Sequence, residues 1–153
     1  MTRNDLEYNI YYSHYLEKMF SVITGRIDKF ISFSLLMSGS AVFASFGSNV
    51  FFGFLVALLS SIALIYEFGK KSSASLEQSK SYHSLIINIP ELSDDQLRQK
   101  FSDINSKDGT IWNCLSVAAR KRTMQALYGE IDKNTRYTKF QYLMSWLAGD
   151  APS

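Results

Sequence analysis

Polar and apolar positions are interspersed over most of the chain, but one long stretch contains no charged residue. It covers Phe30–Tyr66, and every acidic and basic side chain lies outside it. One bilayer crossing needs roughly 17–25 helical residues, so this stretch is too long for one ordinary crossing. It divides at Gly47-Ser48-Asn49, a cluster of turn-forming residues. The pattern therefore predicts a hairpin of two transmembrane helices, Phe30–Phe46 and Val50–Tyr66.

Each predicted crossing has 17 residues. At 1.5 Å per residue it spans roughly 26 Å, slightly less than the hydrocarbon core, and a short helical extension closes the gap. A buried hairpin of a soluble protein is the alternative. A cleaved signal peptide is disfavoured, because the apolar stretch begins only at residue 30 and a second crossing follows.

Basic residues flank the hairpin on both sides, and the turn between the crossings has none. By the positive-inside rule, both termini are expected in the cytoplasm. The residues concerned are Lys18, Arg26 and Lys29 before the first crossing, and Lys70, Lys71 and Lys80 after the second.

The segment before the hairpin, residues 1–29, predicts a cytoplasmic amphipathic helix. Its apolar stripe consists of Tyr8, Tyr12, Tyr15, Met19 and Val22. Residues 67–153 are expected to form a helical cytoplasmic region. A first helix continues the second crossing until Pro90, with a packing face formed by Leu76, Ser79, His83, Ile86 and Ile87.

Three further helices are expected after Pro90. Ser93 and Gln96 have the spacing of a capping box and open the first. The second begins near Ile111 and ends near Gly129, and the third is a short amphipathic helix that holds Tyr137, Phe140, Met144 and Leu147. No strand pattern of useful length is present. The predicted fold class is thus an all-α membrane protein.

Composition limits the classes of function that the chain can have. The 16 Lys and Arg residues nearly balance the 14 Asp and Glu residues, which argues against a generally basic nucleic-acid binder. One cysteine excludes an internal disulfide, and two distant histidines leave little for a metal site. The common nucleotide-binding and hydrolase motifs are missing from the sequence. We expect no enzyme activity, cofactor or metal.

Small residues repeat along both predicted crossings. Such residues let membrane helices approach closely, either within one hairpin or between copies. The serines of the first crossing could instead line a pore once several copies assemble. The residues are Ser34, Ser38, Ala41 and Ser45 in the first crossing, and Gly53, Ala57 and Ser60 in the second.

Charged residues suggest two further contacts. Glu67 is spaced to pair with Lys71 at the membrane interface, and with Lys70 these residues could form a charge ring at a pore mouth. A basic cluster could instead bind an acidic partner, anionic lipid or nucleic acid, although a solvated helix face is the simplest interpretation. It comprises Arg120, Lys121 and Arg122, with Arg136 and Lys139 farther along the chain.

The layout resembles the SLATT family of two-transmembrane proteins from bacterial conflict systems. The resemblance rests on the pre-membrane segment YYSHYLEKMF, the closely spaced hairpin Phe30–Tyr66 and the following segment FGKKSSASLEQ. It implies an inner-membrane effector of anti-phage defence. Such an effector oligomerises and permeabilises the membrane when a separate cytoplasmic regulator releases it. A retron reverse transcriptase–DNA complex and a nucleotide-signalling protein are the implied kinds of regulator.

Two hypotheses follow for the function. The first is the membrane effector, whose bilayer-embedded hairpin forms homo-oligomers. The second is a non-conducting adaptor, phage exclusion protein or inhibitor that binds a partner through its cytoplasmic helices. Membrane potential during expression distinguishes them.

Overall fold

The computed structural model describes residues 2–43, 49–129 and 136–150. Within these ranges the chain is helical and has no β-strand, so the all-helical class predicted from the sequence is confirmed there. The helices are α1 (Arg3–Phe43), α2 (Asn49–Tyr66), α3 (Phe68–Asn88), α4 (Asp94–Asn105), α5 (Ser116–Tyr128) and α6 (Lys139–Leu147), with short 3-10 turns η1 (Ile89–Glu91) and η2 (Asn113–Leu115).

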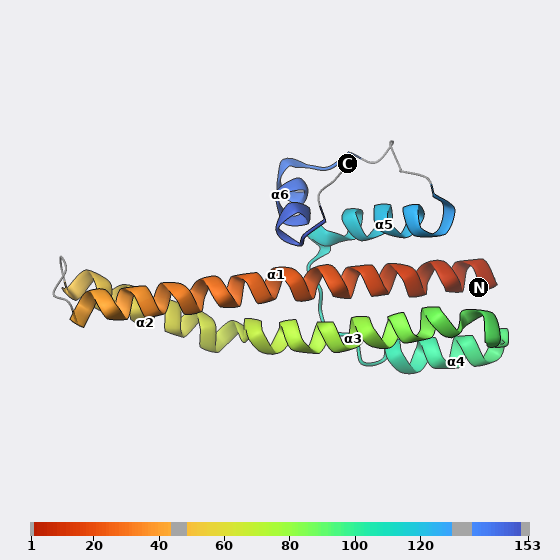
Figure 1. The fold of residues 1–153 in the computed structure, drawn as a ribbon, viewed down its shortest axis with the longest axis horizontal. Coiled ribbons are helices and arrows are strands. Elements are labelled where there is room, and N and C mark those ends of the chain that lie inside the picture. Colours follow the sequence, from red (N-terminus) through yellow and green to blue (C-terminus); the bar gives the residue numbers. More distant parts are fainter. Residues whose placement is uncertain (1, 44–48, 130–135, 151–153) are drawn as a thin grey trace.

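The long helix α1 is the axis of the molecule (Figure 1). Helices α2 and α3 run back along it, α4 lies beside α3, and α5 and α6 pack on the opposite side of α1. At one end only α1 and α2 remain. We call this end, residues 30–43 and 49–66, the apolar rod, and the remaining described residues the head.

Helix α1 continues from the head into the apolar rod without interruption. The sequence analysis placed a boundary at residue 29, where the charge pattern changes. The helix continues there because Ile27-Asp28-Lys29 contains neither proline nor glycine, and an interior position needs one of these or a competing turn to end a helix. The change of surface chemistry therefore occurs within one element.

Two hydrophobic clusters hold the head together, and α1 contributes to both. In the first, Leu6 and Ile10 pack against α3 and α4; the buried partners are Tyr82, Leu85, Ile89 and Leu97. In the second, Met19, Phe20 and Ile23 pack against α5, the turn before it and the end of α6; the buried partners are Leu115, Ala118, Ala119 and Ala148. Burial on both faces explains why the predicted tyrosine stripe accounts for only part of the packing: Tyr12 and Tyr15 are half-buried at the edge of the second cluster.

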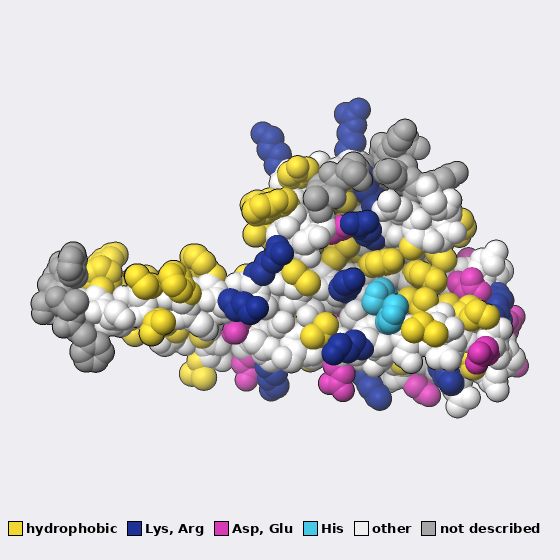
Figure 2. Space-filling model, viewed as in Figure 1, with side chains coloured by type: hydrophobic (Ala, Val, Ile, Leu, Met, Phe, Trp, Pro, Cys, Tyr) yellow, Lys and Arg dark blue, Asp and Glu magenta, His cyan; other side chains and the backbone are white. Residues whose placement is uncertain are grey.

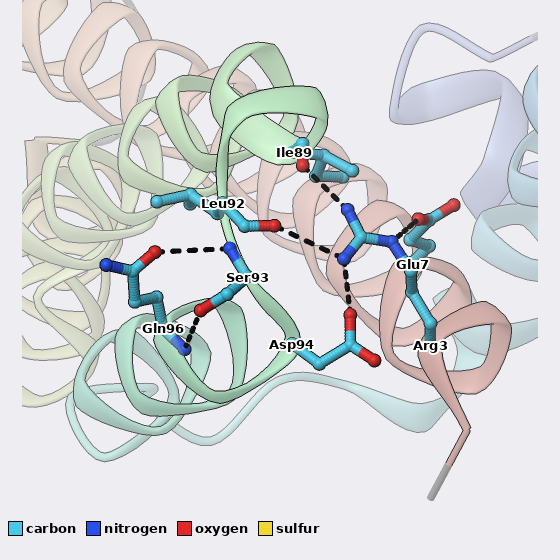
Figure 3. Close-up of polar contacts among 7 residues, drawn as sticks. All are labelled: Arg3, Glu7, Ile89, Leu92, Ser93, Asp94 and Gln96. Carbon is cyan, nitrogen blue, oxygen red and sulfur yellow. Dashed lines mark hydrogen bonds and ion pairs between the residues drawn. The ribbon is translucent and has the colours of Figure 1, made fainter.

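The turn between α3 and α4 is fastened to the start of α1 by Arg3 (Figure 3). Its guanidinium donates to the carbonyls of Ile89 at 2.8 Å and Leu92 at 3.2 Å, and it also pairs with Asp94. Beside it, the predicted capping box is confirmed: Ser93 and Gln96 exchange hydrogen bonds at the start of α4. The sequence analysis missed the role of Arg3, because an arginine near a chain end has no recognisable pattern.

The packing face of α3 differs from the predicted one. The buried residues are Phe68, Ser75, Ser79, Tyr82 and Leu85, whereas Leu76, His83 and Ile87 are exposed. Only Ser79 is buried among the predicted residues, and Ile86 is half-buried. The prediction failed because it followed the aliphatic residues. The helix instead buries small serines against α1, where they permit close approach.

Candidate functional site

The apolar rod carries large hydrophobic side chains on its surface. Helix α2 has no buried residue. The stretch Asn49–Glu91 is long and apolar enough to cross a membrane, and none of its most apolar part is buried within the molecule. A contiguous exposed surface of this kind marks contact with lipid or with another protein. The exposed residues include Phe30, Phe33, Leu36 and Met37 of α1, and Val50, Phe51, Phe54, Leu58, Leu64 and Ile65 of α2.

The described part of the first predicted crossing is shorter. The structure describes its residues 30–43, which span about 21 Å at 1.5 Å per residue. This length alone does not cross a hydrocarbon core of about 30 Å. One helix is therefore established as long and apolar enough to span a membrane, and the second crossing stays a prediction.

The two stripes of small residues occupy different surfaces. Ser38 is only 5% exposed, and Ser34 and Ala41 beside it are half-buried. Gly53, Ala57 and Ser60 of α2 are exposed. The stripes thus do not face each other within one chain, and the α2 stripe is free to meet another surface. Ser45 lies outside the described residues.

The junction between α2 and α3 is a single residue in an unusual conformation. Glu67 has φ 47° and ψ 46°, the left-handed region, which costs an L-residue roughly 1–2 kcal/mol. Its carboxylate pairs with Lys70 at 3.4 Å, not with Lys71 as predicted. The Lys71 ammonium lies 5.8 Å from the centre of the Tyr66 ring. All three charged side chains are exposed, so the pairing adds little to stability.

Helices α1 and α3 approach closely just beyond this junction. A Cβ atom added to Gly25 would lie 2.8 Å from the Ser72 hydroxyl, and one added to Gly69 would lie 3.1 Å from the Asp28 carboxylate. The Ser72 hydroxyl also donates to the carbonyl of Ser21 at 2.8 Å. These contacts fix α3 against α1 at the base of the apolar rod.

Deeper in the head, Glu17 of α1 is buried between α1 and α3. It is 1% exposed, and neither carboxyl oxygen has a hydrogen-bond partner in the described part of the chain. Burial raises its pKa from 4.5 to about 7, the negative charge of Asp108 adds to the shift, and the Ser75 hydroxyl opposes it. The Ser75 hydroxyl therefore lowers the pKa of Glu17 although it does not form a hydrogen bond with the carboxyl group.

A neighbouring acid has the opposite environment. Asp108 accepts hydrogen bonds from the Tyr82 hydroxyl at 2.7 Å and from the Gln78 amide at 2.5 Å. A cavity of about 440 Å³ lies beside Glu17; its lining includes Glu17, Phe20, Lys71, Ser75, Gln78, Lys107 and Trp112. The sequence analysis missed Glu17, because a glutamate between a leucine and a lysine in an amphipathic helix normally faces water.

The predicted basic cluster is divided by its contacts. Arg122 pairs with Asp150 and donates to Gln125 at 3.1 Å, while the Lys121 ammonium lies 4.5 Å from the centre of the Tyr137 ring. Both therefore hold the C-terminal helices together. Arg120, Arg136 and Lys139 are exposed. Arg122 is also exposed despite its contacts, whereas Lys121 is half-buried.

The described residues contain no group of three or more His, Cys, Asp or Glu side chains that could hold a metal ion. Cys114 is half-buried at the edge of the second cluster, and burial raises its pKa. The His14 ring contacts the carbonyl of Ser79 at 2.9 Å and lies beside His83, with ring centres 5.3 Å apart. Packing in the head therefore accounts for the positions of Cys114 and of the two histidines.

Comparisons with known proteins return no matching family model, no matching curated protein and no matching solved structure.

Proposed function

We propose that this protein is a bacterial inner-membrane effector of anti-phage defence. It inserts a two-helix hairpin into the bilayer, oligomerises and permeabilises or depolarises the membrane when a cytoplasmic regulator releases it. The observation that carries the proposal is the exposed apolar surface of α2, which extends beyond the packed head. Lipid is the solvent in which such a surface is stable.

The proposed topology places the head, with both termini, in the cytoplasm. Lys18, Arg26 and Lys29 precede the apolar rod, and Lys70 and Lys71 follow it, so positive charge gathers on the head side. Figure 2 supports this division: Lys and Arg side chains lie on the head, whereas hydrophobic side chains dominate the visible part of the rod.

Oligomerisation is assigned to the exposed stripe of α2. Two helices alone enclose no aqueous path, so conduction requires several copies. Gly53 and Ala57 offer a small-residue surface on the outside of the rod, and a Cβ atom added to Gly53 meets nothing within 4 Å. A neighbouring copy can approach this surface closely. Once copies assemble, the first-helix serines are the proposed lining of the path, and Ser38, which is covered within a single chain, joins this lining when the helices of the hairpin rearrange.

The regulator is expected to bind the head. Arg120 is exposed on α5, and a partner with acidic side chains or phosphate groups would match its charge. The regulator itself would be a separate protein or protein–nucleic acid complex.

The membrane potential of bacteria that express the chain alone tests the effector proposal. A voltage-sensitive dye should report depolarisation before growth stops. Preserved potential in cells whose membranes contain the protein, both alone and during phage challenge with its neighbouring genes, would contradict an effector and favour the non-conducting adaptor.

A glycine pair tests the oligomer surface. Gly53→Leu is expected to abolish crosslinked oligomers and depolarisation while leaving membrane insertion intact. Gly39→Leu is the matched control, because a Cβ atom added to Gly39 also meets nothing within 4 Å but this residue lies on α1. Normal oligomers with Gly53→Leu would remove the α2 stripe from the proposal.

Ser38→Leu tests the path itself, and undiminished depolarisation would exclude Ser38 from its lining.

A further inference from the structure

Helix α6 carries an apolar surface that no other part of the described chain covers. Its inner side packs on the second cluster through Met144, Leu147 and the buried Ser145. Four large side chains of the same helix are exposed, and Trp146 among them is 57% exposed. We call these residues the α6 face: Phe140, Tyr142, Leu143 and Trp146.

The α6 face lies near the base of the apolar rod. Arg26 of α1 donates to the carbonyls of Leu147 at 2.7 Å and Trp146 at 3.5 Å, so the end of α6 is held at the level of residue 26. Residue 26 precedes the uncharged stretch by four residues, about 6 Å along the helix. The headgroup layer extends roughly 5–7 Å beyond the hydrocarbon core on each side. The end of α6 is therefore placed at headgroup depth.

The figures agree with this placement. Helices α5 and α6 form a lobe on one side of α1. Figure 1 shows α6 at the end of this lobe nearest the apolar rod, with α5 farther away. Figure 2 shows hydrophobic side chains gathered at that same end of the lobe. The α6 face thus lies at the end of the head from which the apolar rod extends.

The side chains of the α6 face suit a bilayer interface. Tryptophan and tyrosine favour the headgroup level, where the ring meets apolar groups and the polar atom stays hydrated. Lys139 and Arg136 are exposed beside the face and can reach lipid phosphates with their charged ends. The helix is also pre-formed, because Thr138 and Gln141 make a capping box at its start.

We propose that the α6 face docks on the phospholipid headgroup layer of the same bilayer that the apolar rod enters. The head is then held to the membrane at two places: through the rod and through α6. This proposal rests on the membrane location in the proposed function but not on conduction or on defence.

Tryptophan fluorescence tests the proposal in the full chain. The chain has two tryptophans, Trp112 and Trp146. Trp112 packs against Phe20 and Phe68, so Trp112→Phe keeps an aromatic ring there and leaves Trp146 as the only reporter. The protein is placed in phosphatidylcholine–phosphatidylglycerol vesicles that contain lipids brominated at shallow or deep acyl positions. We expect shallow bromines to quench Trp146 more strongly than deep ones, and the bilayer to shield it from aqueous acrylamide.

Two controls separate the possible results. Trp146→Phe leaves Trp112 as the only reporter, and bromolipids should quench it less than Trp146 because it packs inside the head against Phe20 and Phe68. Phe54→Trp, in a chain with both native tryptophans replaced by phenylalanine, reports whether α2 is inserted and should be quenched by deep bromines.

Three results would overturn the proposal. Quenching of Trp146 by acrylamide but not by bromolipids would show that water covers the α6 face. Protection from both quenchers would show that a second copy or another part of the protein covers it. In either case, quenching at position 54 would leave the membrane location intact. Lack of lipid quenching at position 54 as well would overturn the membrane location itself.

Discussion

Helix α1 takes part in two regions with opposite surfaces. In the head it buries Leu6, Ile10, Phe20 and Ile23 between two layers of helices, whereas in the apolar rod it exposes Phe33 and other large side chains. The residue types overlap, but the neighbours differ. In the head, protein atoms remove apolar groups from water, whereas in the rod the described residues leave them uncovered. Hydrophobicity alone therefore does not define a core; the packing partners do.

The largest expected difference between the regions comes from truncating one leucine in each. Leu97 is fully buried in the head, and Leu64 is exposed on α2. Leu97→Ala should destabilise the head by about 2–5 kcal/mol, because it removes packed methyl groups and leaves a cavity. Leu64→Ala should leave the head unchanged. Thermal unfolding of the purified protein in detergent measures both. A comparable loss from Leu64→Ala would mean that the rod contributes to the folded core.

An arginine introduced at one matched position in each region gives a second comparison of the rod and the head. Leu58 in the rod and Leu76 in the head are both 45% exposed. Leu58→Arg should oppose insertion by about 2.5–3.5 kcal/mol, as expected for an arginine near the centre of a bilayer. Leu76→Arg should change stability by less than about 0.5 kcal/mol, because water already surrounds it. Resistance to alkaline extraction reports insertion. Equal extraction of both variants would place water around both leucines.

Glu17 provides a pH-dependent test of the packed region. The pKa is raised from 4.5 to about 7, so between these values the folded protein keeps a proton that the unfolded chain releases. Stability should therefore fall as pH rises from 4.5 to 7 and level off above 7. Glu17→Gln should recover roughly 3 kcal/mol at pH 8, and little at pH 4.

Glu77→Gln is the control for this test, because Glu77 lies exposed on α3. Chemical unfolding at several pH values measures the effect. Identical pH profiles for Glu17→Gln and the parent would show that the acid is solvated or paired in solution.

The sequence predicted the elements better than their contacts. Local signals were sufficient for the capping box at Ser93, the end of α5 before Gly129 and the uncharged stretch, because each depends on neighbouring residues. The start of α5 at Ser116 was missed by five residues. A 3-10 turn from Asn113 intervenes, and Trp112 before it has an extended backbone.

Long-range features could not be found in the same way. The pairing of Arg3 with Asp94, the burial of Glu17 and the contact of Arg26 with Leu147 join residues that are far apart along the chain. Each depends on how two helices are placed, and a single sequence has no periodic signal for that. The sequence predicted the α6 helix itself. Its position at the base of the rod follows only from the contact with Arg26, which no local pattern indicates.

The conformation of Glu67 has a consequence for the shape of the hairpin. Helix α1 is an unbroken shaft of 41 residues, about 61 Å long, while α2 and α3 meet at one left-handed residue. Backbone hydrogen bonds still run through this junction, from Glu67 to Ala63 and from Lys71 to Glu67, so the chain changes direction there without losing its helical bonding. The first side of the hairpin is thus one straight element, and the second side is two elements joined at a bend. The hairpin is asymmetric in this respect.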